Sequence, residues 1–182
     1  LQFLYIGDEA CSDVVDMTLS HFVLLTRLRI GSRACPRVTH MECRHLHHLT
    51  SIVIGDDSFT QSPQLQEDAS PFVFDVTDCT SLLQLAIGRT SFPYFQLRTD
   101  QLPSLQHFSA GLHVDVKKVM EEDQVTGICS DAPAAQERRR NAFADSSFAL
   151  RNAKSLKTFL VGDGSFSKAM QLVLQAPQLE TL

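Results

Sequence analysis

The chain has 182 residues, of which 43% are hydrophobic and 20% charged, a balance typical of a folded protein with a buried core. Its formal net charge of −5 provides no basic excess of the kind that binds nucleic acid, so no nucleic-acid partner is predicted. The longest apolar runs, such as residues 22–25, are far shorter than the roughly 20 residues of a membrane span. No membrane-spanning segment is predicted.

One short sequence returns along the chain. It begins as LQFLYIGDEAC at residue 1 and comes back as LTRLRIGSRAC, LTSIVIGDDSF, LLQLAIGRTSF and LKTFLVGDGSF. Aligned on the first leucine, the copies start at residues 1, 25, 49, 82, 105, 156 and 179, with a basic period of about 24 residues. The two longest spacings predict polar loop insertions at about 60–71 and 117–145. We therefore predict one repeat array over residues 1–182, which is a fragment of a longer array.

Each copy predicts two extended segments. Positions four and six, such as Leu28 and Ile30, are apolar and alternate with positions three and five, which is the period of a strand. The glycine that follows allows the backbone to turn where a side chain would interfere. The same alternation returns before the next copy, as at residues 72–76, so little helix is expected. A large residue after each glycine is predicted to fill the core, with an internal stack of Phe59, Phe92 and Phe166.

The copies read LxxLxIGxx, then Ser or Ala, then Phe or Cys. In this pattern they resemble the leucine-rich repeat family, and most closely its irregular, β-rich subclass. The resemblance implies a β-rich repeat solenoid of the horseshoe-like class, with a parallel sheet on the concave face and short strands and turns on the convex side. It also implies binding of another macromolecule. The asparagine usual at the ninth position is missing, and Ser58, Ser91 and Ser165 are predicted to supply its hydrogen bonds to the backbone.

Positions three and five of each copy are predicted to point out of the concave sheet, because positions four and six point into the core. Tyrosine and arginine are enriched at binding hot spots, and the first two copies carry both. We therefore predict an exposed protein-binding face formed by Phe3, Tyr5, Arg27, Arg29, Ser51, Val53, Gln84 and His107. For Phe3 and Tyr5 an alternative stays open, in which side chains of a neighbouring unit cover them.

No catalytic motif stands out in the sequence. It contains no HExxH motif and no recognisable Ser/His/Asp set, which predicts a protein that is not an enzyme and has no cofactor. The predicted function is a non-catalytic scaffold that binds a protein partner. Two alternatives stay open: a structural spacer, or the recognition segment of a larger receptor or ubiquitin-ligase adaptor whose active module lies outside this chain.

The segment VTHMECRHLHH, residues 38–48, contains four histidines and a cysteine, which are residue types that bind zinc. The repeat pattern places Cys43 inside and His40, His45, His47 and His48 outside or in a turn. These histidines are therefore not expected to converge with Cys43, and no metal site is predicted.

The five cysteines include no CxxC pair, so they do not resemble the disulfide framework of a small secreted protein. A reducing, cytoplasmic compartment fits this pattern better. Cys11 and Cys35 occupy the same position in neighbouring copies and are predicted to be small buried side chains without a disulfide between them.

Overall fold

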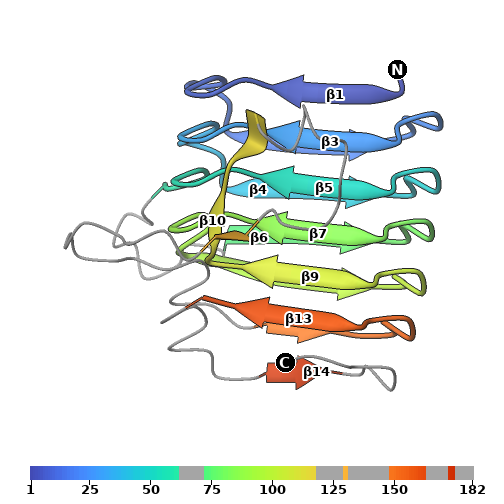
Figure 1. Ribbon diagram of the computed structural model, residues 1–182. Helices are drawn as coiled ribbons and strands as arrows, with labels where there is room; N and C mark the ends of the chain where they lie inside the picture. Colours follow the sequence, from blue (N-terminus) through green and yellow to red (C-terminus); the bar gives the residue numbers. More distant parts are fainter. Residues whose placement is uncertain (62–71, 118–128, 131–147, 163–171, 175–182) are drawn as a thin grey trace.

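The computed structural model describes residues 1–61, 72–117, 129–130, 148–162 and 172–174 (Figure 1). The two predicted insertions, at about 60–71 and 117–145, lie mainly outside these residues. Ser165 and Phe166 lie wholly outside them. The strands are β1 (Phe3–Ile6), β2 (Asp16–Ser20), β3 (Arg27–Ile30), β4 (His40–Arg44), β5 (Ser51–Ile54), β6 (Phe72–Thr77), β7 (Gln84–Ile87), β8 (Phe95–Asp100), β9 (His107–Ala110), β10 (His113–Val114), β11 (Cys129–Ser130), β12 (Phe148–Leu150), β13 (Thr158–Val161) and β14 (Leu172–Leu174).

Twelve of these strands form two parallel sheets. The first sheet has the order β1-β3-β5-β7-β9-β13, and the second has the order β14-β12-β8-β6-β4-β2. The chain alternates between the sheets, so each strand pairs with the equivalent strand of the next copy, as Leu28 pairs with Ile52 and Ile52 with Leu85. Figure 1 shows the first sheet as a stack that runs from blue to red. The predicted β-rich, parallel architecture is confirmed, and within the described residues helical backbone is limited to residues 116–117.

The remaining strand pair is different in kind. β10 and β11 pair in antiparallel fashion, His113 with Ser130 and Val114 with Cys129.

Among the described residues, no helix has the length and hydropathy that crossing a bilayer requires.

The core lies between the two sheets. Leu28 and Ile30 from the first sheet, and Met41 and Cys43 from the second, are fully buried in one apolar cluster. The rings of Phe59 and Phe92 stack with their centroids 4.2 Å apart. The predicted stack is confirmed for this pair.

The turn after each strand of the first sheet is held against the turn of the preceding copy. A Cβ atom added at Gly55 would lie 2.7 Å from the backbone nitrogen of Ser32, so a side chain does not fit there. Ser58 Oγ donates a hydrogen bond to the Gly31 carbonyl oxygen (2.8 Å) and accepts one from the Ala34 N–H (3.2 Å). Ser91 Oγ donates to the Gly55 carbonyl oxygen (2.8 Å). The predicted hydrogen bonds of serine side chains to the backbone are confirmed for Ser58 and Ser91.

These turns contain pairs of residues in left-handed backbone conformation, a feature that the sequence analysis missed. Asp57 and Phe59 have φ of 57°, and Thr90 and Phe92 have φ of 52° and 56°. Each such residue costs roughly 1–2 kcal/mol when it is not glycine. Hydrogen bonds between neighbouring turns offset this cost: the Asp57 N–H donates to the Arg89 carbonyl oxygen (2.8 Å), and the Phe92 N–H donates to that of Ser58 (3.1 Å).

Four cysteine thiols, those of Cys11, Cys35, Cys43 and Cys79, are free. Cys35 is fully buried, and burial together with the neighbouring Cys11 thiol raises its pKa to about 12. Burial likewise raises the pKa of Cys79 to about 12. The prediction that Cys11 and Cys35 form no disulfide is confirmed, and Cys35 is buried as predicted, whereas Cys11 is only half-buried.

The buried Cys79 thiol makes stability depend on alkaline pH. Its pKa is higher in the folded state than the ordinary value of 9.0. The stability that the protonated thiol contributes is therefore fully present below pH 9 and is lost as pH rises toward 12. Raising the pH from about 8 to about 10.5 should lower the free energy of unfolding by ~2 kcal/mol through Cys79 alone. Urea unfolding of the reduced wild type and of Cys79→Ala at both pH values measures this difference. Equal pH dependence of the two proteins would contradict it.

Candidate functional site

The predicted binding residues lie on the outer face of the first sheet. Phe3 and Tyr5 are each 36% exposed, and Arg27 and His107 are half-buried. In contrast, four residues of the predicted face are buried, with exposed fractions of 5% or less: Arg29, Ser51, Val53 and Gln84. The prediction that this whole face is exposed is therefore wrong.

For Val53 the physical reason is that another part of the chain covers it. Residues 113–117, here called the crossing segment, run past the C-terminal ends of the strands of the first sheet, as Figure 1 shows for the yellow ribbon that contains β10. Val114 and Val116 of this segment form a second apolar cluster with Val53 of β5 and Ala86 of β7. This cluster is separate from the main core and lies on the opposite side of the sheet.

Two aspartates hold the crossing segment in place. Asp56 Oδ2 lies 2.6 Å from His113 Nδ1, and its Oδ1 accepts the Val114 N–H at 3.1 Å. Asp8 Oδ2 lies 2.8 Å from the Lys117 ammonium. Contact with Lys117, together with a hydrogen bond from the Ser32 N–H, lowers the pKa of the Asp8 carboxyl. The segment is thus attached to two different copies of the repeated sequence.

A row of polar groups is buried on the same side of the first sheet. Arg29 Nη1 donates to Ser51 Oγ (3.0 Å) and to the carbonyl oxygens of Leu28 (3.1 Å) and Ser51 (3.3 Å). Ser51 Oγ in turn donates to Gln84 Oε1 (3.2 Å). The row links β3, β5 and β7, and its members use their hydrogen-bonding capacity inside the protein. Arg29 is therefore part of the structure and not a free group for a partner.

One end of the face stays accessible. Phe3 and Tyr5 on β1, together with Arg27 on β3, form what we call the aromatic–arginine patch. The Arg27 guanidinium carbon lies 5.5 Å from the centroid of the Phe3 ring, which is within the range of a cation–π contact. The patch combines apolar surface with a positive charge.

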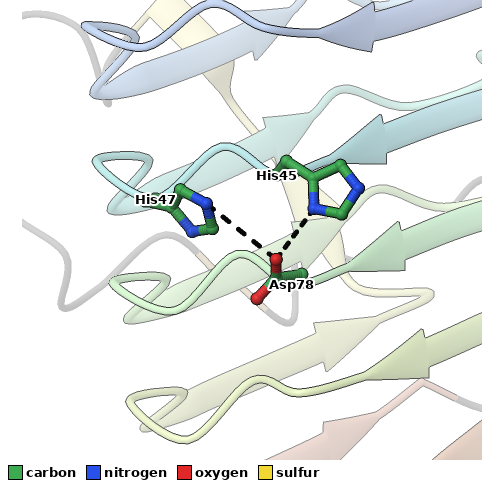
Figure 2. A group of neighbouring side chains, drawn as sticks. All are labelled: His45, His47 and Asp78. Carbon is green, nitrogen blue, oxygen red and sulfur yellow. Dashed lines mark hydrogen bonds and ion pairs between the residues drawn. The ribbon is translucent and has the colours of Figure 1, made fainter.

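The histidine-rich segment has a different arrangement from the one predicted. Cys43 is fully buried and separate from the histidines, as expected. However, the nitrogen atoms of His45 and His47 lie near the carboxylate of Asp78, which follows β6 (Figure 2). Asp78 lies outside the histidine-rich segment 38–48 and was not predicted as part of this group. The signal was present, because Asp78 and His45 both stand four residues before the first leucine of the next copy.

Comparison with known proteins adds no relative to this description. No protein-family model matches the chain. Comparison with curated proteins yields no match, and neither does comparison with solved structures. The class that the structure defines is therefore a β-rich protein built on two parallel sheets, with one outer face partly covered by its own chain.

Proposed function

We propose that this chain is a protein-binding scaffold of the leucine-rich repeat type, without catalytic activity. Support for the repeat solenoid comes from the register of the sheets, in which residues one period apart pair directly, as Leu4 does with Leu28. Units of this kind bury a shared core only by stacking on their neighbours, and the stack then presents extended surfaces to partners.

The observation that carries the proposed function is the aromatic–arginine patch. Phe3 and Tyr5 keep about a third of their surface exposed beside Arg27. Tyrosine and arginine dominate binding hot spots because they combine a large apolar area with polar groups. The crossing segment buries the middle of the sheet, so the interface that we propose is confined to this end. Its partner is a protein that presents an apolar side chain and a carboxylate.

A photo-crosslinking amino acid in place of Tyr5 should capture the partner from cell lysate. The matched position is Thr18 on β2, which is exposed in the second sheet. A protein that crosslinks from position 5 and not from position 18 is then purified for affinity measurements. If the chain is only a structural spacer, the proteins that crosslink from position 5 should be the same as those that crosslink from position 18.

Arg27→Glu should weaken binding of that partner at least tenfold, because the reversed charge repels the partner's carboxylate. The control is Arg98→Glu, which reverses the charge of an exposed arginine on β8 of the second sheet. Titration calorimetry with both variants measures the difference. Equal affinities of Arg27→Glu and Arg98→Glu for the partner would show that the patch is not part of the interface.

A further inference from the structure

Two histidines and an aspartate come together at one edge of the second sheet. His45 and His47 follow β4, and Asp78 follows the neighbouring strand β6 (Figure 2). One potential ligand atom from each residue lies within 4.8 Å of the other two. We propose that His45, His47 and Asp78 form an open binding site for a divalent cation of the zinc class.

The separations between these atoms are close to those that a bound cation needs. His45 Nδ1 lies 2.8 Å from Asp78 Oδ2, and His47 Nε2 lies 3.9 Å from the same oxygen. A tetrahedral zinc ion with bonds of about 2.0–2.1 Å places its ligand atoms roughly 3.3 Å apart. Small side-chain rotations are sufficient to reach this spacing. They are possible because the side chains of His45 and His47 are 59% and 54% exposed.

The backbone holds the three residues in position. His45 and Asp78 both have φ of 55° and stand at equivalent places in adjacent turns. The His45 N–H donates to the Thr77 carbonyl oxygen (3.2 Å), which ties its turn to the residue before Asp78. Leu46 is fully buried between the two histidines. Its burial anchors the turn and keeps His45 and His47 on the outside.

The ligand types determine which cation fits. Imidazole nitrogen with carboxylate oxygen suits zinc, nickel and copper, whereas calcium and magnesium prefer oxygen ligands alone. Three protein ligands also leave a fourth position for water, as in zinc sites that are not purely structural. The nearby thiols of Cys43 and Cys79 are buried in the core and are not ligands. This site lies away from the aromatic–arginine patch and does not depend on the proposed function.

The test is titration of the metal-free 182-residue protein with zinc chloride, monitored by calorimetry. We expect one saturable site, and we expect His45→Ala, His47→Ala and Asp78→Asn each to weaken binding at least tenfold. The matched control is His40→Ala, because His40 lies on the same sheet but contacts Glu42 (3.3 Å). The zinc affinity of His40→Ala should equal that of the wild type, and calcium chloride should not compete with zinc for the site.

Thermal unfolding separates loss of the site from loss of the fold. Without zinc, His47→Ala should unfold at the wild-type temperature because its side chain is exposed, and with zinc only the wild type and His40→Ala should gain stability. Absence of saturable zinc binding to the folded wild type would overturn the proposal. Zinc binding of equal strength in His47→Ala and His40→Ala would overturn it as well.

Discussion

Replacing Phe92 with alanine should lower the free energy of unfolding by about 3–5 kcal/mol. The side chain is fully buried, and its ring stacks on Phe59 at 4.2 Å and on Phe74 at 4.6 Å between centroids. Phe95 adds an edge-on contact at 4.9 Å. The truncation therefore removes contacts to two strands of the second sheet and to the turn after β5, and it leaves a cavity that the parallel strands cannot close.

Urea unfolding measures this loss, and Phe22→Ala is the matched control. Phe22 lies in a turn and is 38% exposed, so the same chemical change there should have a much smaller effect. A loss for Phe92→Ala no larger than that for Phe22→Ala would contradict the assignment of Phe92 to the centre of the core.

Arg29→Glu is expected to lower the free energy of unfolding by about 3–5 kcal/mol, as is typical when a buried ionic group loses its partners. The Arg29 guanidinium donates to the carbonyl oxygens of Leu28 and Ser51 and to Ser51 Oγ. A carboxylate in its place would face these acceptors without donating to them. By the pattern of the sequence, Arg27 and Arg29 are equivalent surface residues, and this equivalence is the part of the prediction that the structure corrects.

Comparison of Arg29→Glu with Arg27→Glu tests the correction directly. Arg27 lies two residues earlier on β3 and is only half-buried, so its replacement should change stability by roughly 0.5 kcal/mol. Both values come from urea unfolding at neutral pH. Similar values for the two variants would mean that Arg29 is not buried in solution.

The crossing segment also bears on where a partner can bind. Because Val114 and Val116 occupy the surface above Val53 and Ala86, a partner would have to displace them to reach the middle of the sheet. The ion pair of Lys117 with Asp8 and the hydrogen bond of His113 with Asp56 oppose such displacement. Binding at the aromatic–arginine patch requires no such change.

The sequence by itself determined the β-rich class and the pairing of equivalent strands in the first sheet, whereas it predicted the strands of the second sheet only as extended segments. The pairing was predictable because equivalent residues of successive copies stand side by side, so a period in the sequence becomes a pairing in space. Leu28, Ile52 and Leu85 share one position of the copy and one layer of the core. The same logic predicted Ser58 and Ser91 as substitutes for asparagine, and the stack of Phe59 on Phe92.

Only the tertiary structure decided which parts of the surface are covered. His113 contacts Asp56, 57 residues earlier, and no period relates these two positions. The contact of Val53 and Ala86 with Val114 and Val116 follows from this departure from the repeat and is therefore invisible in the pattern of any one copy. The grouping of His45 and His47 with Asp78 depends on left-handed turns and side-chain directions that residue types alone do not specify. Repetition determines the core because its contacts are periodic, whereas non-periodic contacts determine the surface and the candidate sites on it.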